Sequence, residues 1–249
     1  MRKVDIMRTS ASRPEFLKIS TEALQKHLIA KDIEFRWLIH EDCLNKQLSN
    51  QCMKYIEECG LYTAIKLNNP AIGQGASLTW LIKQVNTKYV INFEDDFEAI
   101  QDINVNQLIE LMDNNPDINQ IAFHKRNIMP QKPGFKKIQI VRDGITLVTN
   151  PHWAFTPSMF RLSYLKPKWI NFKLEPHWKM NERLKSTKGL RNAEWVMKNT
   201  GTYFLGQIKN KKLLKEHGGN MEKEEYDKIN GGHMAYHLGQ GRSRRENSY

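Results

Sequence analysis

The sequence has few cysteines and no long apolar run, and both shortages exclude classes of protein. Its 249 residues include three cysteines, Cys43, Cys52 and Cys59. An odd number of cysteines without a CxxC pair argues against a disulfide framework and against a zinc knuckle. The sequence contains no run of about 18 apolar residues, which is the length that a transmembrane helix needs. The N-terminal MRKVDIMRTS reaches polar residues too early for a signal peptide. We therefore expect a soluble, cytoplasmic protein with reduced thiols.

The chain also lacks internal repeats and long polar tracts. Its hydrophobic fraction of 40% and charged fraction of 26% are ordinary for a globular protein. A chain of this length can bury one large core, and we expect a single domain spanning residues 1–249.

The charge balance is strongly positive. Lysine and arginine number 38 against 27 aspartates and glutamates, which gives a net charge of +11. Such an excess favours a polyanionic partner, either nucleic acid or an anionic membrane surface. A lysine-rich soluble protein without such a partner would show the same charge.

The first hundred residues alternate between strand and helix patterns. Pro14 can start the first helix, and Gly60 can end the second. This alternation predicts an α/β fold with a mostly parallel central sheet and helices on both faces. The predicted strands cover residues 3–9, 34–42, 62–67 and 88–93, and the predicted helices cover residues 14–29, 43–60 and 76–85.

The second half has a less regular pattern. It predicts a helix over residues 105–115 that ends before Pro116, a strand over 118–124 and a hairpin over 137–150 that turns at Asp143 and Gly144. Residues 150–195 then hold four of the six tryptophans, namely Trp153, Trp169, Trp178 and Trp195. This enrichment suggests a region that lines a pocket, although each ring could equally belong to the core.

Three consecutive carboxylates follow an apolar run in VINFEDDFEAI, residues 90–100. Glu94, Asp95 and Asp96 lie at the carboxyl end of the predicted strand, where ligands bind in open parallel sheets. Mutual repulsion would be relieved by a hard divalent ion, Mn²⁺ or Mg²⁺, that keeps positions open for substrate phosphates. The alternative is the start of a helix, because carboxylates also favour a helix N-terminus.

Several motifs together resemble one enzyme family. In chain order they are SASRPEFLKISTEAL, HED, NNPAIGQGASLTWLIKQVNTKYVINFEDDF, NAEW and HLGQGRS. They resemble the GT-A fold nucleotide-sugar glycosyltransferases of the large inverting family, over about the first 100 residues and then only at isolated motifs. The resemblance implies a Rossmann-like domain. Residues 1–100 would bind the nucleotide sugar, and residues 101–249 would form the acceptor half and a C-terminal closing segment.

The resemblance also implies roles for the acidic triplet, Glu94, Asp95 and Asp96. In the family such a triplet binds the metal that holds the diphosphate, so Asp96 is the expected metal ligand. Glu94 and Asp95 would lie near the donor sugar or ribose. Family members commonly carry Ala-Arg-Asn in the helix before this strand, whereas residues 75–77 of this chain are Gly-Ala-Ser. The donor sugar therefore does not follow from the resemblance.

Further donor-binding residues are implied at the ends of the first two strands. Thr9, Ser10 and Arg13 occupy positions where the family contacts the nucleoside, and the planar guanidinium of Arg13 could pair with phosphate. Arg13 could instead form a surface ion pair. Asp42 matches the carboxylate that accepts a hydrogen bond from the base, expected to be uracil, with Glu41 as the neighbouring candidate. Either carboxylate could instead cap the following helix.

The remaining implied residues lie late in the chain. Glu194 matches by order the base that takes the proton from the acceptor hydroxyl, although it could be a solvated helix glutamate. His237 is the expected further metal ligand, with His217 as its rival. Arg242 and Ser243 would close over the diphosphate, although a disordered basic tail has a similar composition.

The sequence therefore predicts a metal-dependent inverting glycosyltransferase with a nucleoside diphosphate donor, UDP being the expected nucleotide. The positive charge favours a hydroxylated base in DNA as the acceptor, flipped from its stack. Cell-envelope glycans and protein side chains are alternative acceptors. Two other classes stay open, a nucleic-acid-binding module without catalysis and a metal-dependent nuclease or phosphotransferase. The donor sugar and the oligomeric state do not follow from the sequence.

Overall fold

In a computed structural model of the protein, the described residues are 1–123, 139–149, 156–170, 202–205 and 235–238. Among them, nine strands form one central sheet, and two further pairs of short strands lie beside it. The sheet consists of β1 (Arg2–Ser10), β3 (Ile33–Asp42), β4 (Tyr62–Asn68), β5 (Tyr89–Asn92), β8 (Gln120–Ala122), β9 (Gln139–Arg142), β10 (Ile145–Thr149), β11 (Ser158–Arg161) and β12 (Thr202–Leu205). The short pairs are β2 (Leu28–Ile29) with β7 (Ile103–Asn104), and β6 (Phe97–Ala99) with β13 (Ala235–His237).

The strand order in the sheet is β4-β3-β1-β5-β11-β8-β12-β10-β9. The first four strands are parallel to one another, and β8 is parallel to β12. By contrast, β11 runs antiparallel to both of its neighbours, and β9 and β10 form a hairpin. The prediction of an α/β fold with a mostly parallel central sheet is confirmed. The insertion of β11 between β5 and β8 was not predicted.

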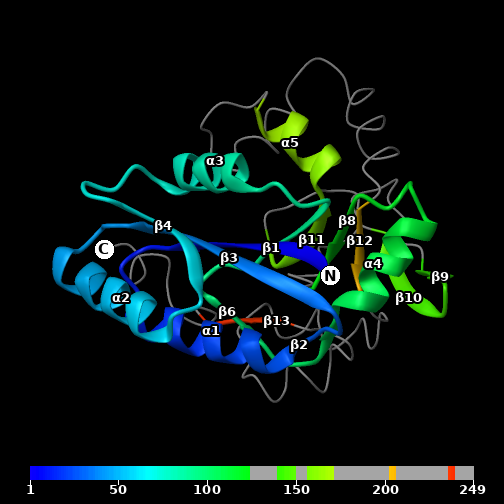
Figure 1. Cartoon of the computed structure of the whole chain (residues 1–249), viewed down its shortest axis with the longest axis horizontal. Helices are drawn as coiled ribbons and strands as arrows, with labels where there is room; N and C mark the ends of the chain where they lie inside the picture. Colours follow the sequence, from blue (N-terminus) through cyan, green and yellow to red (C-terminus); the bar gives the residue numbers. More distant parts are fainter. Residues whose placement is uncertain (124–138, 150–155, 171–201, 206–234, 239–249) are drawn as a thin grey trace, which may run out of the picture.

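Helices cover both faces of the sheet, as predicted (Figure 1). On one face lie α1 (Pro14–His27) and α2 (Lys46–Cys59), and on the other lie α3 (Gln74–Gln84) and α5 (Leu162–Ile170). The apolar side chains of α4 (Val105–Asn114) pack into the same core cluster as those of α1 and α2.

Successive side chains of β1 point to opposite faces of the sheet, so this strand packs against the helices on both faces. Ile6 belongs to the core cluster that contains Leu17 of α1, whereas its neighbour Met7 belongs to the cluster that contains Leu78 of α3. All four side chains are fully buried. Burial of each such side chain contributes about 1.5–3 kcal/mol. The apolar run of β1 therefore stabilises both helical layers.

The turn predictions agree with the structure. Gly60 follows α2 with a φ of 63°, and the β9–β10 hairpin turns at Asp143 and Gly144 with φ values of 47° and 75°. These are left-handed conformations, which glycine adopts at little cost and aspartate tolerates.

The predicted end of the first helix and the alternative interpretation of the acidic triplet were wrong. The first helix ends at His27, because Leu28 and Ile29 leave it to pair with β7. The acidic triplet does not start a helix, since strand β6 begins directly after Asp96. None of the helices in the described residues is long and apolar enough to span a membrane.

Candidate functional site

The carboxyl ends of three adjacent parallel strands meet at one edge of the sheet. The backbone N–H of Asp95 donates to the carbonyl of Thr9 at 3.1 Å, and Ser10 pairs in register with Glu41 of β3. The acidic triplet therefore lies beside the end of β1. The predicted residues Thr9, Ser10, Arg13 and Asp42 are brought to the same edge, because β1 lies between β3 and β5.

Arg13 forms ion pairs with two members of the triplet. Its Nε donates to Oδ2 of Asp95 at 3.1 Å, its Nη2 contacts Oδ1 of Asp95, and its Nη1 donates to Oδ2 of Asp96 at 3.0 Å. The side chain of Arg13 is 34% exposed and that of Asp96 is 19% exposed, whereas that of Asp95 is fully buried. The guanidinium that was predicted to meet a phosphate thus contacts Asp96, the predicted metal ligand, and Asp95, which was predicted to lie near the donor sugar or ribose.

The close carboxylates perturb one another. Burial raises the pKa of Asp95 to about 6 even though the charge of Arg13 opposes the shift. Burial also raises the pKa of Glu94 well above its usual range, and the negative charges of Asp96 and Asp95 add to this effect. Burial alone would lower the pKa of Arg13, but the charges of Asp95 and Asp96 outweigh it and raise that pKa. The site therefore favours a positive charge near these carboxylates.

Glu94 has a partner that the sequence analysis missed. The side-chain amide of Gln74 donates to Oε1 of Glu94 at 2.6 Å. Helix α3 begins at Gln74, two residues before the predicted start, so the Gly-Ala-Ser segment 75–77 lies in its first turn. The missed start explains why Gln74 was missed, because the predicted helix began only at residue 76.

Asp42 holds the loop that leads into α3. Its two carboxylate oxygens accept hydrogen bonds from the backbone N–H groups of Ile72 and Gly73 at 2.7 and 2.8 Å. The alternative that Asp42 caps the next helix was wrong, since α2 begins at Lys46 and is capped by Asn45.

Glu41 and Ser12 fasten the loop that carries Arg13. Oε1 of the fully buried Glu41 accepts the backbone N–H of Ser12 at 2.9 Å, and burial raises the pKa of Glu41. The hydroxyl oxygen of Ser12 accepts the N–H groups of Leu44 and Asn45, each at 3.0 Å. The loop after β1 is thereby tied to the loop after β3.

Arg8 is a second cation near the triplet that the sequence analysis did not identify. It is fully buried, donates through Nη2 to Oγ of Ser20 at 2.6 Å and lies 5.9 Å from the ring centre of Phe93. Its charge acts to lower the pKa of Asp95. The sequence signal was an arginine directly after the apolar residues Ile6 and Met7 of β1, which could have been interpreted as a buried charge that needs an anionic neighbour.

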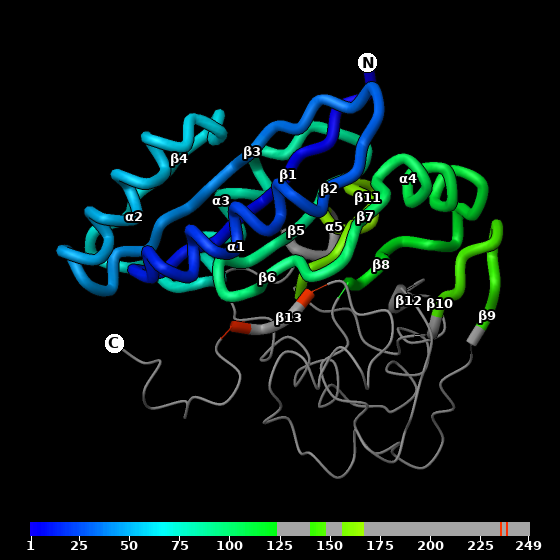
Figure 2. The backbone as a smooth tube through the Cα atoms, turned by 90° about the horizontal axis from the view of Figure 1, so that it is seen from below, coloured from blue at the N-terminus to red at the C-terminus, as the bar shows by residue number. Residues whose placement is uncertain are grey.

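The C-terminal segment reaches the triplet through a strand pair. In this pair β13 lies beside β6 (Figure 2). The two strands are antiparallel, with His237 opposite Phe97 in register. The backbone N–H of Leu238 donates to the carbonyl of Asp96 at 2.7 Å. This register places His237 beside the triplet in the chain trace. The predictions for Glu194, His217, Arg242 and Ser243 lie outside the described residues.

The donor set suits a hard divalent ion only in part. Carboxylate oxygens of Asp95 and Asp96 already face one cation, the guanidinium of Arg13, and oxygen ligands are those that Mn²⁺ and Mg²⁺ prefer. Within the described part of the chain, no three histidines, cysteines, aspartates or glutamates form a ready metal site. The chemistry of the ligands fits, because such an ion is commonly held by one or two carboxylates together with water and substrate phosphates.

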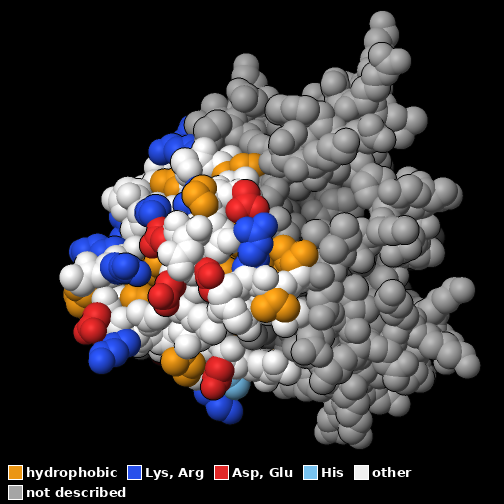
Figure 3. Space-filling view, turned by 90° about the vertical axis from the view of Figure 1, so that its right-hand side faces the viewer, with side chains coloured by type: hydrophobic (Ala, Val, Ile, Leu, Met, Phe, Trp, Pro, Cys, Tyr) orange, Lys and Arg blue, Asp and Glu red, His pale blue; other side chains and the backbone are white. Residues whose placement is uncertain are grey.

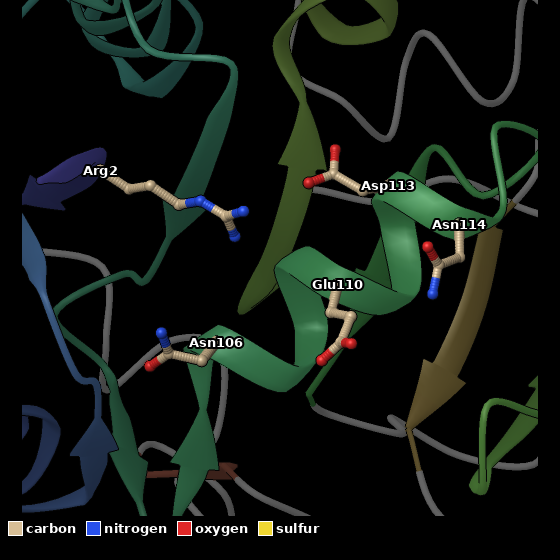
Figure 4. Close-up of a pocket in the computed structure, with 5 residues that line it drawn as sticks. All are labelled: Arg2, Asn106, Glu110, Asp113 and Asn114. Carbon is tan, nitrogen blue, oxygen red and sulfur yellow. The ribbon is translucent and has the colours of Figure 1, made fainter.

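A shallow hollow of about 370 Å³ lies away from these residues (Figure 4). Arg2 extends toward it from the start of β1, and the other lining residues, Asn106, Glu110, Asp113 and Asn114, lie on α4. Arg2 and Ser10 are at opposite ends of β1, roughly 26 Å apart for an extended strand. The hollow is therefore not part of the candidate site.

No family model matches the chain, and no curated protein does. Among solved structures, S. aureus TarS 1–349 in complex with UDP-GlcNAc matches with a TM-score of 0.50 and 15% identity, over 92% of this chain and 70% of that chain. TarS 1–349 without a named ligand matches with a TM-score of 0.50 and 14% identity, over 82% and 58%. The Pyrobaculum calidifontis mannosyltransferase PcManGT in complex with GDP-Man and Mn²⁺ matches with a TM-score of 0.48 and 8% identity, over 66% and 46%.

The chain spans only part of the length of the structures that it matches. At these identities the similarity describes the fold alone. The fold similarity to TarS extends over most of this chain. It agrees with the four adjacent parallel strands β4, β3, β1 and β5 and with the helices that cover them. The chain therefore has a fold of the GT-A glycosyltransferase type.

Proposed function

We propose that the protein is a single-domain, metal-dependent inverting glycosyltransferase that uses a nucleoside diphosphate sugar, with UDP as the nucleotide. The observation that supports this most directly is the convergence of Ser10, Asp42 and the acidic triplet at the carboxyl ends of parallel strands. Ligands bind at this edge in open α/β sheets. One matched TarS structure is a complex with UDP-GlcNAc, which supports a nucleotide sugar as the donor.

The donor would lie across the ends of β1 and β3. In this proposal Thr9 and Ser10 contact the nucleoside, and Asp42 accepts a hydrogen bond from the base. Each carboxylate oxygen of Asp42 accepts one backbone N–H and retains a second lone pair, so Asp42 can hold its loop and still accept a hydrogen bond. Glu94 would contact the ribose or sugar, with its carboxylate oriented by Gln74, and the buried Asp95 would support the same region.

The metal would be Mn²⁺ or Mg²⁺, held by Asp96 with His237 as a further ligand. When bound, such an ion would stabilise the negative charge on the departing diphosphate. The donor chemistry of Asp96 and the register of β13 beside β6 support this assignment.

The proposed transfer needs one general base. Glu194 would take the proton of the acceptor hydroxyl as that oxygen bonds to the anomeric carbon of the sugar. The bond between this carbon and the diphosphate breaks, and its electron pair leaves with the diphosphate. Attack from the face opposite the diphosphate inverts the anomeric configuration. Arg242 and Ser243 would close over the diphosphate.

The charge distribution supports a polyanionic acceptor. Residues 1–123 contain 13 lysines and arginines against 17 aspartates and glutamates, whereas residues 124–249 contain 25 against 10. On the described part of the face in Figure 3, acidic and basic side chains are interspersed. The positive excess thus belongs to the acceptor half. We propose a hydroxylated base in DNA as the acceptor, with cell-envelope glycans as the alternative.

The test is mass spectrometry of products formed with a panel of sugar nucleotides and Mn²⁺. Hydroxymethylated DNA and cell-envelope glycans would be supplied as separate acceptors, with unmodified DNA as the control for the first. We expect the mass of one sugar to be added to hydroxymethylated DNA alone. Addition to the glycans instead would reject the DNA acceptor, and failure to use any sugar nucleotide would reject the transferase. A nuclease would cleave DNA with metal and no sugar nucleotide.

A further inference from the structure

Arg13 occupies the position where the acidic triplet would hold a cation. Its guanidinium contacts both Asp95 and Asp96, and the contact to Asp96 uses Oδ2 of the carboxylate proposed to bind the metal. Two positive charges bound to the same carboxylate oxygen repel and compete for its lone pairs. The divalent ion and Arg13 therefore compete for Oδ2 of Asp96 in this arrangement.

The two halves of the Arg13 contact differ in strength. Asp95 is fully buried and receives two N–H contacts from Arg13, whereas Asp96 is 19% exposed and receives one. Bidentate pairing is stronger and more rigid than a single contact, and solvent weakens an exposed ion pair. Asp95 is thus the anchor for Arg13, and Asp96 is the partner that can be released.

The loop backbone does not have to move for this release. Ser12 is fixed by Glu41 and by the backbone of Leu44 and Asn45. Arg13 is 34% exposed, and its side chain can rotate about its own bonds while the backbone remains anchored. The guanidinium also has more N–H donors than its three contacts use, so it can bind a phosphate oxygen while it stays on Asp95.

The second arginine of the site cannot make the same exchange. Arg8 is fully buried and bonded to Ser20, and it acts on Asp95 from within the core. Its charge is fixed in the protein whether or not a ligand binds. Of these two cations, Arg13 is the one that can reach both the carboxylates and the solvent.

We propose that Arg13 is a resident counter-ion that competes with the divalent metal for Asp96, and that the nucleoside diphosphate relieves this competition by drawing the guanidinium toward its phosphates. The inference rests on the proposed function. Its consequence is positive coupling, because the diphosphate removes the rival of the metal, and the metal frees Arg13 to bind phosphate. Such coupling is reciprocal for the two ligands.

The test measures Mn²⁺ binding rather than catalysis. Free Mn²⁺ is followed by electron paramagnetic resonance in titrations of the full chain, with and without saturating UDP. In the wild-type protein we expect UDP to tighten Mn²⁺ binding about tenfold or more. In Arg13→Gln, Mn²⁺ should bind more tightly than in the wild type without UDP, and the effect of UDP should fall below about threefold. Arg142→Gln, which removes a distant surface arginine, should behave as the wild type.

A second variant covers the case in which Arg13→Gln does not fold. Arg13→Lys keeps the charge but loses the forked contacts, so its coupling should lie between the other two. If a folded variant still binds UDP and UDP tightens its Mn²⁺ binding as much as in the wild type, Arg13 does not have the proposed role. The proposed function would remain intact in that case. If UDP binds to neither wild type nor variant at any Mn²⁺ concentration, the proposed function itself fails, and the coupling fails with it.

Discussion

The side-chain amide of Gln74 donates a hydrogen bond of 2.6 Å to Oε1 of Glu94. Gln74 is the first residue of α3, directly before the Gly-Ala-Ser segment in which this chain differs from the family that it resembles. The hydrogen bond links the start of α3 to the acidic triplet. A residue that orients Glu94 from this helix therefore affects the part of the site where we expect the donor sugar or ribose.

Gln74→Ala should weaken the binding of the donor. The change leaves Glu94 without this hydrogen bond, and a typical hydrogen bond contributes about 0.5–1.5 kcal/mol. We expect the Kd of the sugar nucleotide, measured by calorimetry with Mn²⁺, to rise about tenfold. Gln84→Ala is the matched control, because Gln84 is an exposed residue at the opposite end of α3. Equal affinities of the two variants would argue against the role of Gln74.

Asp96→Asn should abolish transfer and weaken the metal-dependent part of donor binding. The amide retains the shape of the carboxylate but loses the negative charge that a divalent ion requires. Donor binding measured with Mn²⁺ and with EDTA should become nearly equal in this variant. Asp102→Asn provides the control, since Asp102 is 69% exposed and pairs with His27. If the protein were a nucleic-acid-binding module, DNA binding would survive the change and no transfer would occur in the wild type either.

Glu194→Gln should separate chemistry from binding. Glutamine cannot accept the proton of the acceptor hydroxyl, and loss of a general base lowers the rate by about 100-fold or more. Donor binding should stay nearly unchanged, because the base acts on the acceptor. The check is a comparison of product formation with calorimetric donor affinity in one preparation. A variant with full activity would remove Glu194 from this role, and Glu175→Gln serves as a control in the same half of the chain.

The features predicted correctly from the sequence depend on local patterns. Apolar runs identified β1, β3 and β5, and the left-handed preference of glycine identified the end of α2 at Gly60. The turn of the β9–β10 hairpin has an equally local signal in Asp143 and Gly144. Such signals lie within a few residues of the structure that they specify.

The missed features depend on contacts between distant residues. Arg13 and Asp95 are 82 positions apart, and no local pattern indicates that they pair. The place of β11 between β5 and β8 also depends on distant strands. In the same way, the sequence located the acidic triplet but not its division between Arg13 on one side and Gln74 on the other.

His40 should make the folded state sensitive to mild acid. Burial lowers its pKa, the charge of Asp42 opposes this shift and the charge of Lys66 adds to it. Its Nε2 lies 2.8 Å from the amide nitrogen of Asn68, which can only donate, so neutral His40 accepts there. With the folded pKa below 6.5, the unfolded chain binds more protons as the pH falls below that value. The contribution of His40 to stability is therefore fully present well above pH 6.5 and decreases as the pH falls through that value.

His40→Gln removes this titration while keeping a side chain that can accept from Asn68. The measurement is urea unfolding of both proteins at pH 7.5 and at pH 5. We expect the wild type to lose more free energy of unfolding than the variant between these two values. An equal loss in the two proteins would show that His40 does not contribute to the acid sensitivity.

Asp42→Ala should destabilise the protein even without a ligand. The change removes the two hydrogen bonds from the N–H groups of Ile72 and Gly73, and a typical hydrogen bond contributes about 0.5–1.5 kcal/mol. We expect the free energy of unfolding in urea to fall by about 2 kcal/mol or more. Asp117→Ala, at a residue with a 54% exposed side chain, should change it by less than about 0.5 kcal/mol.

Asp42→Asn separates this loop contact from the proposed contact with the base. Asparagine retains one acceptor oxygen, so its loss of stability should be smaller than that of Asp42→Ala. In Asp42→Asn, the N–H donor of uracil and the two loop N–H groups would have to share one uncharged acceptor oxygen, because the amide nitrogen cannot accept. We therefore expect Asp42→Asn to lose more free energy of UDP binding than free energy of unfolding. Unchanged UDP affinity in a folded variant would confine Asp42 to holding the loop.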